Sequence, residues 1–317
     1  MAGGIGSVRY DEEFTTGSGG LRLFTCRWVP EKQDPKSLIL LCHGYGMECS
    51  ISMRITGIRL AKAGFAVYGI DYRGHGKSAG LQGYIPNFDE LVNDCAKYYT
   101  SVCELPQNKN KMRFLLGESM GGAVVLLLHR KKPSFWHGAV LVAPMCKIAE
   151  EIKPHPVVIK TLTKLSSFIP KWKIVPGKDI TECAFKSPEW REEIRQNPLC
   201  YKGKPRLQTA KELLMVSLDI EKNLNHVSLP FLVIHGGGDT VTDPSVSQAL
   251  YETAVSEDKT FKLYPGMWHA LTSAEPQQNL HLVFADILSW LDERSTTLRD
   301  NQSSRPSRYV KNDAHYA

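Results

Sequence analysis

Short apolar runs recur along most of the chain, and each run is rich in β-branched or aromatic residues. They cover residues 38–42, 65–70, 113–116, 139–143, 231–235 and 260–264. Segments with a helical spacing of apolar residues lie between most of these runs, for example at 53–62, 88–102 and 123–129. Buried strands that alternate with helices are typical of a mostly parallel sheet with helices on both faces.

The segment before the first of these runs has a different pattern. Residues 21–28 alternate apolar and polar side chains directly after a glycine-rich turn at 17–20. Such alternation predicts a strand with one exposed face, so we expect one arm of an antiparallel hairpin at the edge of the sheet. The whole pattern predicts an α/β fold with a sheet of about eight strands.

The alternation of strands and helices stops after Pro144 and resumes only at Phe231. The chain between them contains prolines and amphipathic patterns, such as the apolar stripe of Val158, Leu162, Leu165 and Ile169. We interpret this segment as a helical cap between two halves of one sheet. The predicted division is a first half of the core at 1–145, a cap at 146–225, a second half of the core at 226–294 and a polar, disordered tail at 295–317.

One serine lies in the context that a nucleophile elbow requires. The sequence Gly117-Glu-Ser119-Met-Gly121 follows a short buried strand and precedes an uninterrupted apolar helix. A second Gly-x-Ser-x-Gly sequence, from Gly76 to Gly80, follows a loop and precedes further glycine and proline, so no helix can begin there. Ser119 is therefore the candidate nucleophile, and the alternative is a serine that only caps the helix.

A serine nucleophile needs a base, and the base works best when a carboxylate fixes its tautomer. When an elbow of this kind follows a strand of such a sheet, the acid and then the histidine come later in the chain. The acid candidate is Asp239, which follows the strand at 231–235 and a glycine turn. Asp243 is the rival, but Pro244 follows it directly, which is typical of a helix N-cap.

The base candidate is His269, which lies in the loop after the last predicted strand. A final helix at about 279–291 follows this loop. Two other histidines fit less well, because His235 precedes the acid and His281 falls inside that helix. A lone histidine is more often a hydrogen-bonded structural residue, but position, loop context and chain order agree for His269.

A tetrahedral intermediate also needs two backbone N–H donors. We expect the first from Met120, the residue after the nucleophile. We expect the second from Tyr45, in the loop after the strand at 38–42. His43 comes too early in the chain to be the base, so we expect it to brace that loop.

Composition and charge exclude several classes of protein. The 317 residues carry a net charge of +6, and six lysines without an acidic residue lie between 153 and 178. No basic stripe with interleaved aromatic residues accompanies them, which argues against a nucleic-acid partner. The eight cysteines show no metal-type spacing, and the chain shows no signal peptide and no apolar run of membrane-spanning length. We therefore expect a cytoplasmic protein with reduced thiols and without a metal or other cofactor.

Together these motifs resemble the plant monoacylglycerol lipase group of α/β-hydrolases, which includes caffeoylshikimate esterase. The resemblance covers about residues 10–293 and rests on His43-Gly-Tyr-Gly, Asp71-Tyr-Arg-Gly-His-Gly-Lys-Ser, Gly117-Glu-Ser-Met-Gly-Gly, Ala143-Pro-Met-Cys, Lys202-Gly-Lys-Pro-Arg206 and Tyr264-Pro-Gly-Met-Trp-His-Ala. It implies the α/β-hydrolase fold, ester hydrolysis without a cofactor, nucleophile Ser119, acid Asp239 and base His269. One departure is Gly237-Gly238, where members of the group often have Glu or Thr followed by Ala.

The resemblance also implies a substrate class, and alternatives remain open. We expect hydrolysis of monoacylglycerols or of other single-chain lipid esters, because the caffeoylshikimate esterase branch typically has Asp-Leu-Leu-Gly and Ala-Pro-Leu where this chain has Asp71-Tyr-Arg-Gly and Ala143-Pro-Met. The alternatives are a hydroxycinnamoyl esterase or acyltransferase and, less expected, a non-catalytic receptor with the same fold. The cap stripe with its lysines fits either a helix packed on the core, which is the commoner case, or an interfacial helix in peripheral contact with anionic lipid.

Overall fold

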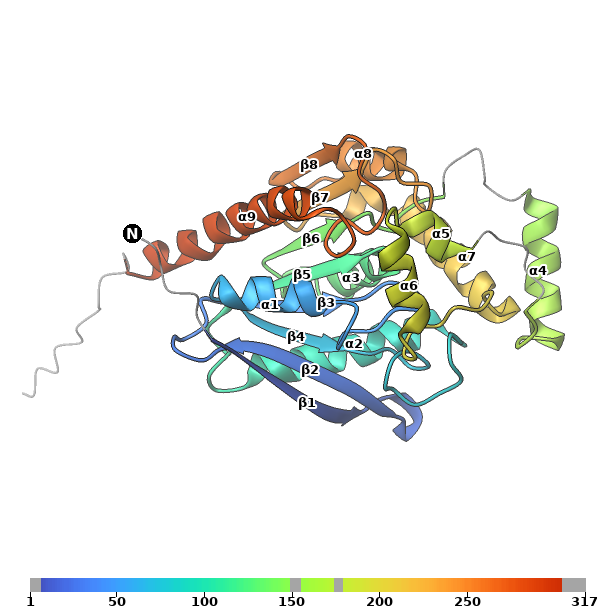
Figure 1. Cartoon of the computed structure of the whole chain (residues 1–317), viewed down its shortest axis with the longest axis horizontal. Coiled ribbons are helices and arrows are strands. Elements are labelled where there is room, and N and C mark those ends of the chain that lie inside the picture. Colours follow the sequence, from blue (N-terminus) through green and yellow to red (C-terminus); the bar gives the residue numbers. More distant parts are fainter. Residues whose placement is uncertain (1–6, 149–154, 174–178, 304–317) are drawn as a thin grey trace, which may run out of the picture.

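The computed structural model describes residues 7–148, 155–173 and 179–303, and an eight-stranded sheet forms their centre (Figure 1). The strands lie in the order β1 (Val8–Thr16), β2 (Arg22–Pro30), β4 (Ala66–Ile70), β3 (Ser37–Cys42), β5 (Met112–Glu118), β6 (Gly138–Val142), β7 (Phe231–Gly236) and β8 (Lys259–Tyr264). β2 pairs antiparallel with β1 and β4, and every other pair is parallel. The predicted mostly parallel sheet and its edge hairpin are confirmed.

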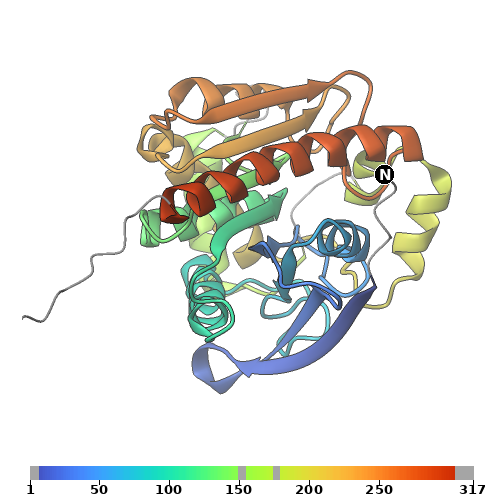
Figure 2. The ribbon, with the colours of Figure 1, turned by 90° about the vertical axis from the view of Figure 1, so that its left-hand side faces the viewer.

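Helices cover both faces of this sheet because the central strands are apolar on both sides. In β3, Leu38 and Leu40 join one buried cluster, whereas Ile39 and Leu41 join the other. The first cluster includes side chains of α2 (Phe88–Glu104), α3 (Met120–Lys131) and α8 (Pro244–Thr253). The second includes side chains of α1 (Arg54–Lys62) and of the long α9 (Gln277–Ser303), which crosses the sheet in Figure 2. There are also two short 3₁₀ turns, η1 (Ser18–Gly20), which has no buried residue, and η3 (Leu224–His226), which adds Leu224 to the first cluster.

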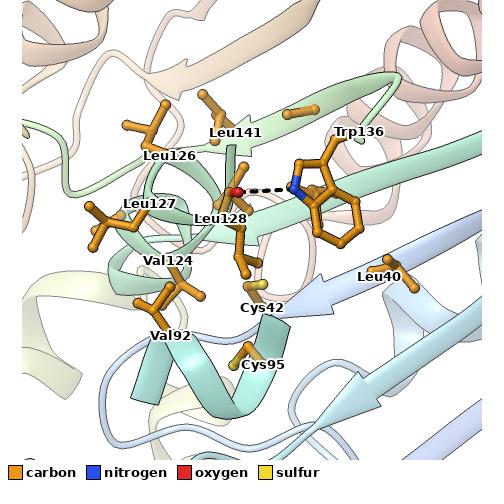
Figure 3. Close-up of a cluster of buried hydrophobic side chains, with 14 of the residues drawn as sticks. Leu40, Cys42, Val92, Cys95, Val124, Leu126, Leu127, Leu128, Trp136 and Leu141 are labelled. Atoms are coloured by element: carbon orange, nitrogen blue, oxygen red, sulfur yellow. Dashed lines mark hydrogen bonds between the residues drawn. The ribbon is translucent and has the colours of Figure 1, made fainter. Parts of the chain in front are cut away.

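The first buried cluster fixes α3, the helix that follows the candidate nucleophile. Figure 3 shows Trp136 beside α3, where its indole N–H donates a hydrogen bond of 3.0 Å to the carbonyl oxygen of Leu128. Cys42 and Cys95 pack in the same cluster. All eight cysteines are free thiols, as the sequence predicted.

In the described residues between β6 and β7, four α-helices lie at the carboxyl edge of the sheet (Figure 1): α4 (Pro156–Phe168), α5 (Ile180–Ala184), α6 (Pro188–Gln196) and α7 (Leu207–Lys222). α7 packs against α2 and α3, whereas α4 contacts α7 and stands away from the sheet. Val158 and Leu165 of the predicted stripe are 48% and 37% exposed. α4 therefore packs on α7 with part of its stripe and leaves the rest exposed, and both interpretations of the stripe stay open. Lys153 and Lys178 lie outside the described residues.

The last helix is longer than the sequence predicted. α9 continues to Ser303, through the first part of the segment that we expected to be disordered. Ser295 is buried there, and it accepts a hydrogen bond of 2.9 Å from the hydroxyl of Ser37 at the start of β3. Arg294 forms an ion pair with Asp258. These contacts hold the helix on the sheet beyond residue 291, and residues 304–317 of the expected tail lie outside the described residues.

Candidate active site

Ser119 lies in a strained turn between β5 and α3. Its backbone angles are φ 54° and ψ −119°, in a region that residues other than glycine rarely adopt. Its N–H donates to the carbonyl oxygen of Val142 at 3.0 Å, and its own carbonyl oxygen accepts from the N–H groups of Gly122 and Met145 at 2.9 Å. Its side chain forms no capping hydrogen bond with α3. This geometry fits a nucleophile elbow and not a simple helix cap.

Two glycines allow the elbow to form. A Cβ atom on Gly117 would lie 2.4 Å from the carbonyl oxygen of Gly121, and one on Gly121 would lie 1.9 Å from the carbonyl oxygen of Cys42. Only glycine lets α3 approach the strands this closely. The other Gly-x-Ser-x-Gly sequence has no such geometry, because the hydroxyl of Ser78 donates to the carbonyl oxygen of Asp71 at 2.6 Å within a loop.

Asp239 lies in the turn after β7, with a side chain that is fully buried. Its Oδ2 atom is 2.6 Å from Nδ1 of His269, in the loop after β8. Its Oδ1 atom accepts hydrogen bonds from the N–H groups of Val241 at 2.7 Å and Thr242 at 3.1 Å. The carboxylate therefore fixes the proton of His269 on Nδ1 and leaves Nε2 as a basic nitrogen.

The electrostatic setting of Asp239 keeps it ionised. Burial alone would raise the pKa of Asp239, but hydrogen bonds from His235 and His269 outweigh burial and hold the pKa below its ordinary value. A carboxylate that stays ionised at neutral pH can stabilise a positive charge on a neighbouring imidazole, as the expected role of His269 requires. Asp243, the rival acid, instead caps α8 and accepts a hydrogen bond of 2.8 Å from the N–H of Ser245.

Ser119 and His269 line the same cavity, of about 70 Å³, under the cap. Its walls include Met47 from the loop after β3 and Ile180 and Phe185 from the cap. A second cavity of about 360 Å³ shares these three residues and continues along the cap to Tyr201 and Lys202. The structure therefore brings the elbow and the His269 loop together beside a space that can hold a substrate.

Of the two residues expected to supply N–H groups to an oxyanion, Tyr45 lines this cavity, and Met120 directly follows Ser119, which also lines it. Gly44 packs against the elbow, because a Cβ atom added to it would be 3.5 Å from Cβ of Ser119. Among the described residues, the N–H groups of Tyr45 and Met120 have no hydrogen-bond acceptor, and Met120 begins α3, where the first N–H groups lack helical partners. An N–H group without an internal acceptor is what the binding of an oxyanion requires.

His43 holds the loop that carries Tyr45. Its Nδ1 atom lies 2.8 Å from the carbonyl oxygen of Gly44, and its Nε2 atom accepts a hydrogen bond of 3.2 Å from the N–H of Tyr72. Burial holds the pKa of His43 well below its ordinary value, so the ring is neutral. His43 therefore contacts the loop backbone, as we expected for a bracing residue.

Sequence reasoning missed two side chains that contact the candidate acid. The hydroxyl of Thr242 lies 3.0 Å from Oδ2 of Asp239, and Nε2 of His235 lies 3.1 Å from the same oxygen. The only signal in the sequence was the position of His235 at the end of a strand, four residues before the acid. Within residues 7–148, 155–173 and 179–303, no cluster of three or more His, Cys, Asp or Glu could hold a metal ion. In the same ranges, no helix is both long and apolar enough to cross a membrane.

Comparisons with known proteins identify the family of this chain. Residues 33–277 match the model of a family described as serine aminopeptidase, S33. Caffeoylshikimate esterase from Arabidopsis thaliana is 35% identical over 283 residues, which cover 89% of this chain and 84% of the relative. Monoacylglycerol lipase from Mycolicibacterium smegmatis is 29% identical over 290 residues, which cover 90% and 98% of the two chains.

A solved structure shows the same fold. A soluble variant of monoglyceride lipase from Saccharomyces cerevisiae, in complex with a substrate analog, superposes with a TM-score of 0.76 at 22% identity, over 92% of this chain and 96% of that one. The fold that the sequence predicted is therefore confirmed. The chain belongs to the serine aminopeptidase S33 family, in the caffeoylshikimate esterase and monoglyceride lipase group of α/β-hydrolases, and it is a serine hydrolase of the carboxylesterase type.

Proposed function

We propose that this hydrolase cleaves monoacylglycerols or other single-chain lipid esters through an acyl-enzyme at Ser119. The observation that carries the proposal is the 2.6 Å hydrogen bond between Asp239 and His269, at a cavity that His269 shares with Ser119. In the first step, Nε2 of His269 takes the hydroxyl proton while Oγ of Ser119 attacks the ester carbonyl carbon.

The remaining steps use the same groups. The N–H groups of Tyr45 and Met120 donate to the oxyanion of the tetrahedral intermediate. The intermediate collapses, the bond to the alcohol oxygen breaks, and His269 donates its proton to the departing alcohol. A water molecule then gives a proton to His269 and attacks the acyl carbon. The bond from this carbon to Oγ of Ser119 breaks, His269 returns the proton to Oγ, and the carboxylic acid leaves.

The walls of the two cavities favour a lipid acyl group. Met47, Ile180 and Phe185 are shared by both cavities and present apolar side chains close to Ser119. Apolar walls with a few polar groups are typical of sites for hydrophobic ligands. The similarity to monoacylglycerol lipases supports the same substrate class.

A hydroxycinnamoyl ester is the second candidate. The 35% identity to caffeoylshikimate esterase favours it, and so do Tyr45, Phe185 and Tyr201 on the walls of the larger cavity. Aromatic side chains can stack on a phenolic ring.

A direct comparison of kcat/KM for a 2-monoacylglycerol and a caffeoyl ester separates the two candidates. We expect the acylglycerol to be the better substrate by about tenfold or more, a difference of about 1.4 kcal/mol in transition-state binding. A higher kcat/KM for the caffeoyl ester would show that hydroxycinnamoyl esters, and not monoacylglycerols, are the preferred substrate class. Ser119→Ala must abolish turnover of both esters, and product analysis with excess alcohol shows whether water or the alcohol accepts the acyl group.

We also propose that the cap binds peripherally to anionic lipid through α4 and the residues after it. Phe168 and Trp172 are 83% and 59% exposed, and Lys160 and Lys164 are exposed on the same helix. Exposed apolar side chains next to lysines are typical of helices that lie at a membrane surface.

Vesicle flotation tests this contact. We expect more binding to vesicles with anionic lipid than to neutral ones, and a loss of binding in the double variant Phe168→Asp and Trp172→Asp. Val255→Asp is the control, because Val255 is 59% exposed but lies at the end of α8. Equal binding to both kinds of vesicle, or no effect of the double variant, would contradict the proposal.

A further inference from the structure

His235 lies at the end of β7, is completely buried, and takes no part in the steps described above. Its Nε2 atom is 3.1 Å from Oδ2 of Asp239, the same oxygen that accepts from His269 at 2.6 Å. Nε2 of His235 is also 2.9 Å from the carbonyl oxygen of Thr242. One carboxylate oxygen of the candidate acid therefore contacts two imidazole rings, one from the strand before it and one from the candidate base.

The neighbours of His235 determine where its proton lies. Nε2 faces the Asp239 carboxylate and the Thr242 carbonyl group, which are both acceptors, so this nitrogen carries a proton and donates it. Nδ1 lies 2.6 Å from Oγ of Ser247, a buried hydroxyl on α8 that has a proton to donate. A neutral ring with its proton on Nε2 satisfies all of these contacts.

These contacts form a chain of hydrogen bonds from α8 to the candidate base. It runs from Ser247 through His235 and Asp239 to His269. His235, Asp239 and His269 are the titratable groups in this chain, and Asp243 is exposed at the start of α8. His235 is not among the residues that line the catalytic cavity, so it acts on His269 through its neighbours Asp239 and Thr242.

We propose that His235 is a positioning residue, which holds the Asp239 carboxylate in line with His269 and takes up part of its negative charge. The proposal rests on the catalytic roles proposed above for Ser119, Asp239 and His269. A carboxylate that shares one oxygen between two N–H donors is restricted in rotation. It also binds each donor less strongly than it would bind a single one.

Loss of this second donor has two consequences. The carboxylate is held less firmly, so kcat falls while KM changes little, because His235 does not touch the cavity. Oδ2 also interacts more strongly with a protonated His269, so the base loses its proton only at higher pH. The acid limb of the kcat/KM profile then moves to higher pH, by about half a unit or more.

Two variants that differ by one methylene group test the proposal. In His235→Gln the amide N–H can reach the position of Nε2 and keep the contact with Asp239. In His235→Asn the amide ends near the position of Nδ1, where it can contact Ser247 but cannot reach Asp239. We expect the Gln variant to stay close to the wild type, and the Asn variant to lose about tenfold to 100-fold in kcat with the shifted acid limb.

The outcomes distinguish positioning from packing. Equal losses in both variants, or a loss in the Asn variant without a shift of the acid limb, would show that His235 is only structural. If the Asn variant does not fold, Ser247→Ala leaves His235 in place but removes the donor to Nδ1. That variant should lower kcat about two- to fivefold and move the acid limb in the same direction; an unchanged profile would overturn the proposal.

Failure of the inference differs from failure of the proposed function. A wild-type protein that neither hydrolyses esters nor reacts with a serine-directed fluorophosphonate would overturn the catalytic roles themselves. A wild type that does both, together with an Asn variant of equal kcat and equal pH profile, would overturn only the role of His235.

Discussion

Ser119 and Ala143 are the non-glycine residues with positive φ in the part of the chain that the structure describes, and they lie side by side. Ala143 follows directly after Val142, the residue whose carbonyl oxygen binds the N–H of Ser119, and its own N–H binds the carbonyl oxygen of Ile234 on β7. Such conformations cost about 1–3 kcal/mol each, and they persist only where the surroundings impose them. Backbone hydrogen bonds to β6 and β7 therefore maintain the unusual conformations of Ser119 and Ala143, in addition to the turn itself.

Because α3 lies so close to the strands, two glycine variants should differ clearly in their free energy of unfolding. Gly121→Ala should destabilise the protein by about 3 kcal/mol or more, because its Cβ would lie 1.9 Å from the carbonyl oxygen of Cys42. Gly237→Ala in the acid turn should be neutral or stabilise by about 0.4–1 kcal/mol, because its Cβ would have no contact shorter than 3.4 Å and its φ is not positive. Urea unfolding of both variants measures this; similar stabilities would contradict the packing described for the elbow.

The two candidate acids predict opposite results for the same substitution. Asp239→Asn should lower kcat by about 10⁴, because the amide cannot hold the Nδ1 proton of His269 in the required tautomer. Asp243→Asn should leave kcat unchanged, because asparagine caps a helix about as well as aspartate. Steady-state kinetics on both variants shows which aspartate is the catalytic acid. A loss of activity in the Asp243 variant alone would make Asp243 the acid and Asp239 a structural residue.

At the scale of helices and strands, prediction succeeded where a segment is buried on both sides. β3 and β7 are fully buried, and their continuous apolar runs are visible in the sequence. For α4 the sequence left two interpretations open, because its apolar stripe does not show how far α7 covers it. The prediction was wrong at the end of α9, where polar residues such as Ser295 and Arg294 are held by partners distant in sequence.

The loop between β4 and α2 predicts a pH dependence of stability. His75 is buried in it, and in the described part of the chain its Nε2 atom has no hydrogen-bond partner. Burial lowers the pKa of His75 to about 4, whereas an unfolded histidine has a pKa of about 6.5. Between these values the unfolded chain binds a proton that the folded chain does not, so the free energy of unfolding falls as the pH falls from 6.5 to 4.

The variant His75→Phe isolates this contribution. It keeps a ring of similar size and removes the titrating group, while burial, the main cause of the lowered pKa of His43, acts in both proteins. From pH 7.5 to pH 4.5 the wild type should lose about 2 kcal/mol more than the variant. Urea unfolding at the two pH values measures the difference, and an equal loss in both proteins would show that His75 is protonated in the folded state.

At the scale of the whole molecule, the order of the strands assembles the site. Ser119 follows β5, Asp239 follows β7 and His269 follows β8, and these parallel strands all end at the same edge of the sheet. Chain order and strand ends were enough to select these residues from the sequence. The contact of His235 with Asp239 was not visible, because it depends on how the turn after β7 folds back against the end of that strand.

The central claim is that Ser119 is the nucleophile of this hydrolase, and covalent labelling tests it most directly. We predict that a serine-directed fluorophosphonate adds once to the native protein, that peptide mapping places the adduct on Ser119, and that Ser119→Ala abolishes it. Asp239→Asn should slow the labelling, because the rate depends on His269 as the base. A native protein that stays unlabelled, or an adduct on Ser78 in the other Gly-x-Ser-x-Gly sequence, would contradict the account.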